Sequence, residues 1–234
     1  MARPIFQLSP RLALCASLVR EGSALCDVGT DHAYLPIFLI KSGKNPCAVA
    51  SDINPGPLAA AAKNTEKYGV EETLALRLSD GLREIGEQEA DDIVIAGMGG
   101  ELILRIVSET PWLRKPEKRL ILQPMSSVEE LRIGLRDLGF AVLEEHAATD
   151  AGKVYSAFSC SYLGTTPETD EWYPYLGKLR PGEPAVKQYA EKMLRELRNR
   201  LKGAERGQGE QTPEELRHII QNIEARYLSQ SGRT

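Results

Sequence analysis

Short, almost entirely apolar runs alternate with longer segments of mixed polarity over the first 139 residues of the chain. The apolar runs predict five buried strands, at residues 24–28, 46–51, 74–78, 92–96 and 119–123. The other segments predict helices, at residues 9–20, 33–41, 58–68, 102–107 and 127–138. Continuous apolar strands that alternate with helices are typical of a parallel sheet covered on both faces.

Local breaks in the pattern indicate where these elements begin and end. The run from Asn54 to Pro57 interrupts the chain before the third helix, and Pro124 is expected to close the fifth strand. Ser9 should cap the first helix, and Ser126 or Ser127 the fifth, which Gly139 is expected to end.

The pattern changes after Gly139. Residues 140–147 and 154–162 predict two further strands, which are separated by the turn-rich Asp150-Ala151-Gly152 and by no helix. Such a hairpin would add an antiparallel strand to the sheet edge. A mostly parallel sheet finished in this way is the layout of class I methyltransferases, so the predicted fold class is α/β with a Rossmann-like methyltransferase sheet.

A linker and two amphipathic segments follow Gly164. Apolar residues recur in these segments at the alternating spacings of four and three that are typical of coiled coils. They are Val186, Ala190, Met193, Leu197 and Leu201, then Leu216, Ile219 or Ile220, Ile223 and Tyr227. We predict an antiparallel helical hairpin in a monomer, with a coiled-coil dimer as the competing interpretation. The predicted domains are a catalytic domain at 1–164 and a linker with C-terminal helices at 165–234.

Composition and cysteine spacing argue against a membrane-spanning, a secreted and a metal-binding protein. At 42% hydrophobic and 26% charged residues, the chain is typical of a soluble globular protein. No run approaches the length of a membrane span, and the first residues lack the apolar core of a signal peptide, so we expect a cytoplasmic location and no membrane partner. The four cysteines are far apart and form no C-x-x-C pair. We expect buried reduced thiols, with Cys26 and Cys47 in core strands, and no metal site.

The turn after the first predicted strand carries the first candidate chemistry. Asp27, Gly29 and Asp31 surround the expected start of a helix, and Gly29 would let the backbone approach a ligand closely. A dinucleotide site favours three glycines and neutral donors that face a pyrophosphate. One glycine with two carboxylates better suits a ligand with hydroxyls and a positive charge, which favours S-adenosylmethionine. A plain strand-to-helix turn is the alternative.

Acidic residues also follow the second and third predicted strands. Asp52, with Ile53 beside it, is expected to accept hydrogen bonds from ribose hydroxyls, and Asp80, before Gly81, from an adenine amino group. Ligands of open parallel sheets bind at the carboxyl ends of the strands. Helix capping is the alternative for each aspartate alone.

Glycines dominate the end of the fourth predicted strand. We predict that Ala96, Gly97 and Met98 contact the cofactor, and that Gly99 and Gly100 shape the pocket for the substrate base. Glycines at this density leave backbone groups facing a pocket. A tight strand-to-helix turn is again the structural alternative.

These strings together resemble the bacterial tRNA (adenine(22)-N1)-methyltransferase family. The similar segments are Leu8-Ser9-Pro10-Arg11-Leu12, Asp27-Val28-Gly29-Thr30-Asp31-His32-Ala33-Tyr34-Leu35-Pro36, Ile95-Ala96-Gly97-Met98-Gly99-Gly100, Leu120-Ile121-Leu122-Gln123-Pro124 and the hairpin residues Asp150, Gly152, Lys153 and Tyr155. The likeness covers residues 5–163 closely and the helical tail only in general character. Asp52-Ile53-Asn54 departs from the glutamate-valine-asparagine more common in the family, but Asp52 keeps the carboxylate.

The resemblance implies a class I enzyme that uses S-adenosylmethionine to methylate N1 of adenosine 22 in tRNA. N1 of adenine has an in-plane lone pair, so catalysis consists mainly of positioning. The new base is a cation, for which Asp31 is the candidate stabilising charge. His32 is the candidate for proton transfer or base contact, and Tyr34 for stacking. Core packing is the alternative for both of these side chains.

Charge is distributed unevenly along the chain. Residues 1–173 contain 17 Lys and Arg against 25 Asp and Glu, a net charge of −8, whereas residues 174–234 contain 12 against 8, a net charge of +4. Lys192, Arg195 and Lys202 share one side of a predicted helix, with Tyr189 one turn away. We expect them to contact tRNA phosphates, although a solvated helix face has the same pattern.

Other functions are compatible with the same residues. The chain could methylate another RNA, a protein or a small molecule, or could be a non-catalytic RNA-binding protein with the same fold. An NAD-linked oxidoreductase is a further class, but the G-x-G-x-x-G motif is missing.

Overall fold

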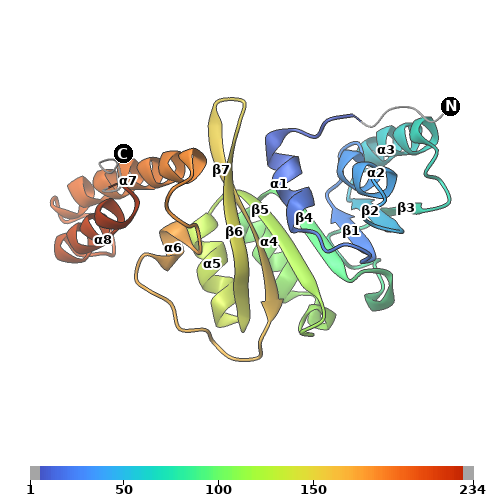
Figure 1. The fold of residues 1–234 in the computed structure, drawn as a ribbon. Coiled ribbons are helices and arrows are strands. Elements are labelled where there is room, and N and C mark those ends of the chain that lie inside the picture. The colour runs from blue at the N-terminus through green and yellow to red at the C-terminus, as the bar shows by residue number, and fades with distance from the viewer. Residues whose placement is uncertain (1–5, 229–234) are drawn as a thin grey trace.

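A computed structural model describes residues 6–228 of the chain. Seven strands form one sheet in the order β3-β2-β1-β4-β5-β7-β6 (Figure 1). The strands are β1 (Leu25–Val28), β2 (Ala48–Asp52), β3 (Leu74–Leu78), β4 (Asp92–Gly99), β5 (Arg119–Ser126), β6 (Phe140–Asp150) and β7 (Lys153–Tyr162). β1 to β5 are parallel, and β7 pairs antiparallel with both β5 and β6. The predicted parallel sheet with an antiparallel hairpin is confirmed.

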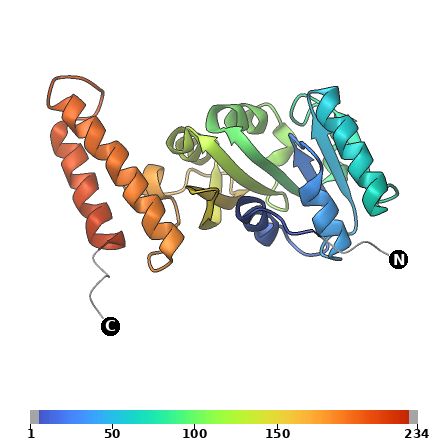
Figure 2. The ribbon, with the colours of Figure 1, turned by 90° about the horizontal axis from the view of Figure 1, so that it is seen from above.

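Helices cover both faces of this sheet (Figure 2). They are α1 (Pro10–Leu18), α2 (Tyr34–Lys41), α3 (Pro55–Tyr68), α4 (Gly100–Ser108), α5 (Val128–Asp137), α6 (Tyr173–Leu176), α7 (Pro184–Ala204) and α8 (Pro213–Tyr227). α1, α2 and α3 pack on one face, and α4 and α5 on the other. Because side chains alternate along a strand, Leu120 and Leu122 join the α4–α5 core while Ile121 joins the other.

Several predicted boundaries and caps are corrected by the structure. α3 already begins at Pro55, since proline is tolerated in the first turn of a helix. β5 continues through Pro124 to Ser126, beside shifts in the β4–β5 register that accommodate a residue without an N–H group. Ser127 occupies the N-cap position of α5 with a φ of 49°, and its hydroxyl does not cap the helix. Cys47 precedes β2 and is exposed, so it is not a core thiol.

The C-terminal hairpin is held to the sheet by a buried polar cluster. Arg132 of α5 is fully buried; its Nη1 donates to the carbonyl of Pro174 (2.7 Å) and its Nη2 to Glu145 Oε1 (2.5 Å). The other oxygen of Glu145 accepts from the backbone N–H of Lys178 (2.8 Å). Tyr189 of α7 lies buried beside Arg132. Lys192 Nζ lies 5.7 Å from the centre of the Tyr189 ring, so the aromatic side chain expected beside the tail charges is present, although it is buried.

α7 and α8 pack against each other within the chain, as predicted, and their apolar seam forms a third core cluster. Thr212 and Glu215 form a capping box at the start of α8. Tyr173, which follows the predicted boundary at 164, belongs to the core of the sheet. The division into 1–164 and 165–234 therefore stays a prediction, and residues 1–5 and 229–234 lie outside the described residues.

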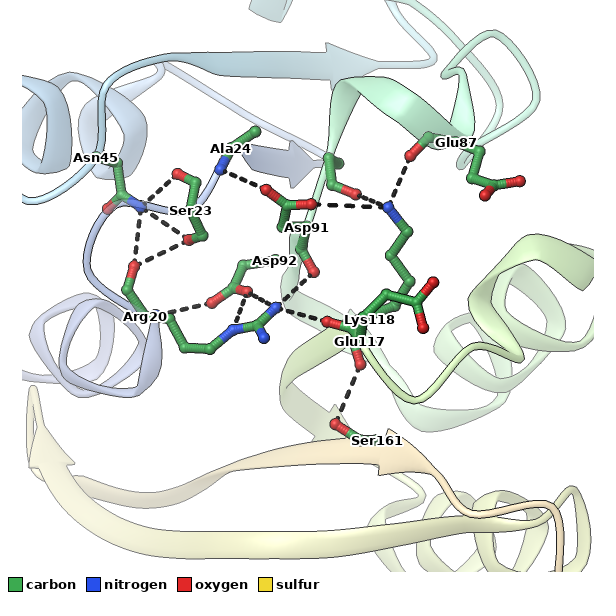
Figure 3. A network of polar contacts seen from close by, with 11 residues as sticks. Arg20, Ser23, Ala24, Asn45, Glu87, Asp91, Asp92, Glu117, Lys118 and Ser161 are labelled. Carbon is green, nitrogen blue, oxygen red and sulfur yellow. Dashed lines mark hydrogen bonds and ion pairs between the residues drawn. The ribbon is translucent and has the colours of Figure 1, made fainter.

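A polar network closes the amino ends of β1, β4 and β5 (Figure 3). The buried carboxylate of Asp92 accepts from the backbone N–H of Arg20 and from its Nε, both at 2.7 Å. Lys118 is also buried and donates to the carbonyls of Ala90 (2.7 Å) and Glu87 (2.8 Å). These charges are satisfied inside the protein, so this end of the sheet has a structural role.

Candidate active site

The opposite edge of the sheet carries most of the predicted site residues. Because β1 to β5 are parallel, their carboxyl ends meet along one edge, and the turns that follow them lie side by side. The acids after β1, β2 and β3 and the glycines of β4 come together there. Lys192, Arg195 and Lys202 lie apart from this edge, on α7.

In the turn between β1 and α2, Gly29 approaches a side chain of the protein itself, and its predicted approach to a ligand stays a prediction. Gly29 has a φ of +76°, and the N–H groups of Gly29 and Thr30 both donate to the carbonyl of Ser51 (2.8 and 2.9 Å). A Cβ atom at Gly29 would lie 2.0 Å from Cε of Met98. The β1 and β4 turns are therefore in contact through Met98, whose side chain covers Gly29 in this structure.

Asp27 is a buried carboxyl group at the end of β1. Its pKa is raised to about 6, because burial disfavours the charged form and Asp52 adds a like charge. A hydrogen bond from the Thr30 side chain acts in the opposite direction. A carboxyl group with a pKa near neutrality beside an open edge is a common property of functional sites.

Asp52 and Ile53 are more accessible. Asp52 is half-buried, and its Oδ1 accepts a hydrogen bond from the backbone N–H of Asn54 (2.7 Å), which orients the carboxylate. Ile53 is 60% exposed although it is apolar. The pair presents acceptor oxygens and an uncovered apolar surface at the end of β2.

Asp80 differs from the other acids because it has basic partners. Its carboxylate accepts from Nη2 of Arg105 on α4 (3.0 Å), and Arg83 lies 3.4 Å away. The hydrogen bond from Arg105 lowers the pKa of Asp80. The neighbouring Gly81 has a φ of +61° and packs against Ile106. The sequence analysis assigned the Asp80 carboxylate to an adenine amino group, but part of its hydrogen-bonding capacity is used by arginines of the protein.

The three predicted catalytic side chains form a connected group at the start of α2. Asp31 is largely exposed, with Oδ2 3.3 Å from Nε2 of His32. The His32 ring is partly exposed and lies 5.4 Å from the ring of Tyr34. Tyr34 is 40% exposed and meets Phe6 edge to face at 5.1 Å. Neither ring is a core side chain, so both remain available to a ligand.

The glycine-rich turn of β4 is held by two residues that the site prediction missed. Gly97 has a φ of +80°, and its N–H donates to Oε1 of the buried Gln123 (3.1 Å). The same oxygen accepts from Nη1 of Arg11 (2.7 Å). In the sequence, a glutamine at the end of an otherwise apolar predicted strand is the signal that could have identified Gln123.

Gly99 and Gly100 have different surroundings. A Cβ atom at Gly100 would lie only 2.1 Å from the carbonyl oxygen of Ser127, and the residue is buried. Gly100 is therefore required for close packing of the β4 turn against the β5 turn. Gly99 is half-buried, and a Cβ atom there would meet Oγ of Ser126 at 3.2 Å.

Large apolar side chains are exposed at the same edge of the sheet, where the carboxyl ends of the strands lie. Of the seven large hydrophobic residues exposed in residues 6–228, five lie at or just after the carboxyl ends of β1 to β5. They are Tyr34, Ile53, Leu78, Leu102 and Met125. Exposed apolar groups beside acids at the carboxyl ends of the strands are compatible with a ligand-binding surface.

The part of the chain that the structure describes lacks two further features. No group of three or more His, Cys, Asp or Glu residues in this range could hold a metal ion. None of the helices there is both long and apolar enough to cross a membrane.

Comparison with known proteins identifies the domain. Residues 8–158 match the family model described as "Methyltransferase domain". A putative tRNA (m1A22) methyltransferase from Streptococcus pneumoniae, solved in complex with S-adenosyl-L-methionine, is 34% identical with a TM-score of 0.79; the match covers 94% of this chain and 99% of that one. TrmK of M. capricolum, solved with S-adenosyl-homocysteine, is 27% identical with a TM-score of 0.75 over 94% and 97%.

A curated relative agrees with these structures. The tRNA (adenine(22)-N(1))-methyltransferase of Bacillus subtilis is 37% identical over 149 residues, which cover 64% of this chain and 63% of the relative. The sequence match thus spans less than two thirds of that relative's length. The predicted class I methyltransferase fold is confirmed.

Proposed function

Because this chain belongs to the tRNA (adenine(22)-N1)-methyltransferase family, as its motifs predicted, we propose that it methylates N1 of adenosine 22 in tRNA with S-adenosylmethionine as the methyl donor. The observation that carries the proposal is the contact between the β1 and β4 turns, where Met98 reaches Gly29. A donor bound at the first turn and a base bound at the second would be adjacent.

The residues of the edge fit S-adenosylmethionine. Asp52 supplies acceptor oxygens for ribose hydroxyls, and the exposed Ile53 and Leu78 supply apolar surface for adenine. Asp27 and Asp31 favour the positive charge of a sulfonium. Asp80, whose charge is paired with Arg105 and Arg83, is proposed to accept from the adenine amino group with its remaining capacity. Gly81, Ala96 and Gly97 complete the proposed cofactor site, and the cofactor requires no metal. When bound, the cofactor supplies an electrophilic methyl group on sulfur.

The proposed catalytic roles follow from the chemistry of N1. Its lone pair forms the new N–C bond while the C–S bond breaks, so no residue has to remove a proton first. We assign Asp31 to stabilise the cationic base, Tyr34 to stack on it, and His32 to accept the N6 proton or to contact the base. Substituting Asp31 by Ala should therefore lower the single-turnover rate far more than the affinity for tRNA.

Methyl transfer to unmodified tRNA tests the proposed function. Tritiated methyl groups from S-adenosylmethionine should enter bulk tRNA, and mapping should locate them at N1 of adenosine 22. A transcript with guanosine at position 22 is the matched control and should stay unlabelled. Binding of S-adenosylmethionine without methylation of tRNA would contradict the proposal and favour another substrate, and binding of NAD instead would favour an oxidoreductase.

We propose that the tail orients the tRNA through phosphate contacts. Among the residues described by the structure, Lys192, Arg195 and Lys202 have no acidic partner, whereas Arg198 and Arg200 pair with Glu224 and Glu129. Within α7, the three unpaired cations are therefore available to an anionic ligand.

Charge reversal tests this role of the tail better than truncation does. Removing the chain after Tyr173 would take away the Pro174 and Lys178 partners of the buried Arg132–Glu145 cluster, so it would also disturb the sheet. Reversing Lys192, Arg195 and Lys202 together should sharply weaken tRNA binding and flatten its salt dependence, with unchanged S-adenosylmethionine affinity. Reversal of Lys41, Lys63 and Arg114, which lie on the body and have no acidic partner among the described residues, is the control. If both triple variants weakened tRNA binding equally, the tail would have no specific role in binding tRNA and would only support the fold.

We also propose that the chain acts as a monomer in the cytoplasm. The apolar seam of α7 and α8 is filled within one chain, which removes the surface that a coiled-coil dimer would use. Light scattering of the purified protein should give the mass of one chain, and a dimer mass would overturn this proposal.

A further inference from the structure

Arg11 is an arginine at the candidate active site that has no role in the functions assigned so far. It lies in the first turn of α1, and its Nη1 donates to Oε1 of Gln123 at 2.7 Å. A Cβ atom at Gly97 would lie 3.4 Å from the same nitrogen. The guanidinium group is therefore positioned directly against the glycine-rich turn of β4.

Gln123 gives this position rigidity. Its side chain is fully buried, and Nε2 donates to the carbonyl of Pro124 (2.9 Å). The amide oxygen therefore faces the other way, where it accepts from both Arg11 and the N–H of Gly97 (3.1 Å). One buried acceptor thus fixes the guanidinium group relative to the glycine-rich turn of β4, in which Gly99 and Gly100 are proposed to shape the pocket for the base.

The charge of Arg11 is not neutralised in the described part of the chain. Its hydrogen-bonded partner is a neutral amide, and Arg11 is absent from the ion pairs of residues 6–228, which include Arg83 and Arg105 with Asp80 at the same edge. Arg11 is also only half-buried, so its remaining N–H donors can reach a ligand. A fixed, unpaired guanidinium group suits bidentate recognition of a phosphate.

The acidic residues around Arg11 give such a contact a role in binding RNA. Asp27, Asp31 and Asp52 give the edge a negative character that favours a cationic cofactor but repels a polyanion. We infer that Arg11 binds a phosphate group of the RNA substrate next to the target adenosine and so presents the base to the glycine-rich turn of β4. This inference rests on the proposed function and assigns to it a substrate-binding residue outside the tail.

A chemical change in the RNA tests the contact directly. Ligated tRNA would carry a neutral methylphosphonate at the phosphate on the 5′ or the 3′ side of the target adenosine. For the wild-type protein, one of these substitutions should lower kcat/KM about tenfold, as for the loss of one charge-assisted hydrogen bond. For Arg11→Ala, natural tRNA should already react about tenfold more slowly in kcat/KM, and the methylphosphonate should have almost no additional effect.

Two protein variants serve as controls. Arg114→Ala removes an exposed arginine just before β5, at the amino end of the sheet, and should behave like the wild type in every assay. Arg11→Lys keeps the charge but not the planar fork, so it should retain sensitivity to the methylphosphonate with a reduced kcat/KM. Calorimetric S-adenosylmethionine affinity should be equal for all four proteins, which also shows that each is folded.

The outcomes separate this inference from the proposed function. Active wild-type protein with an equal methylphosphonate effect in Arg11→Ala would overturn the phosphate contact alone and leave Arg11 as a support for Gln123. If the wild-type protein binds S-adenosylmethionine but does not methylate tRNA, both the proposed function and the phosphate contact of Arg11 are overturned.

Discussion

The two ends of the parallel sheet use charged residues in opposite ways. At the amino end, Asp92 and Lys118 are buried, and each has hydrogen-bonding partners within the protein (Figure 3). At the carboxyl end, Asp31 and Asp52 remain accessible, and five large apolar side chains are exposed beside them. The same residue types therefore stabilise the fold at one end and remain available to ligands at the other.

This difference distinguishes the acidic residues that stabilise the fold from those that can bind a ligand. A buried charge must be paired, because its desolvation is otherwise unfavourable, and pairing leaves it little capacity for a ligand. Asp80 is intermediate, since it lies at the ligand edge yet is bound to Arg105. Substitutions at the two ends should accordingly separate effects on stability from effects on binding.

The largest effect is expected at the amino end. Asp92→Ala removes the carboxylate that accepts from the backbone N–H and the side chain of Arg20, so the free energy of unfolding should fall by about 4 kcal/mol. Urea denaturation would measure it. Asp137→Ala, which breaks only an exposed pair with Arg136, is the control and should change stability by less than about 1 kcal/mol. Similar values for the two variants would contradict a structural role for this network.

A pH-dependent effect is expected at Asp27, in the carboxyl-end site. Its folded-state pKa is about 6, against 3.8 for an ordinary aspartate, so the folded state binds the proton more tightly than the unfolded state. Ionisation therefore destabilises the fold as the pH rises from about 4 to 6, and the penalty is constant above that range. At about 1.4 kcal/mol per pKa unit, Asp27→Asn should be more stable than the wild type by about 3 kcal/mol at pH 7.5.

Urea titrations at pH 4 and pH 7.5 check this prediction. The stability difference between Asp27→Asn and the wild type should be small at pH 4, where both side chains are neutral, and should grow with pH. A difference that is the same at both pH values would mean that Asp27 is not held in an unfavourable charged state. The added stability should be accompanied by weaker S-adenosylmethionine binding, because the variant lacks the carboxylate charge.

The smallest effect is expected at Asp52, and it should appear only in binding. Asp52→Ala should weaken S-adenosylmethionine affinity by about 1–3 kcal/mol, the range for a lost hydrogen bond to a charged group. The free energy of unfolding should change by less than about 0.5 kcal/mol, because the Asn54 N–H that the carboxylate binds is exposed to water. Calorimetry and urea denaturation of the same preparation measure both quantities. Unchanged affinity in the folded variant would remove Asp52 from the cofactor site.

The sequence by itself determined the strands, the order of the acidic strand ends and the hairpin that completes the sheet. These features are local, because an apolar run, a glycine and a carboxylate can be recognised within about ten residues of sequence. In a parallel sheet the carboxyl ends of the strands lie at one edge, so the positions of these residues relative to one another also follow. Gly29, Asp52 and Gly97 could therefore be assigned to one edge before any contact was known. The departures at Pro55 and Pro124 arose because proline is tolerated in the first turn of a helix and beside an irregularity in a ladder.

Only the tertiary structure decided which polar groups are paired. Arg11 meets Gln123 across 112 positions of sequence, Arg105 meets Asp80 across 25, and Arg132 meets Glu145 across 13. A local pattern can predict that an arginine lies on a helix, but its partner depends on how that helix is rotated and packed on the sheet. That packing buries Arg132 and leaves Arg11 unpaired, so it determines which of the two guanidinium groups is available to a ligand.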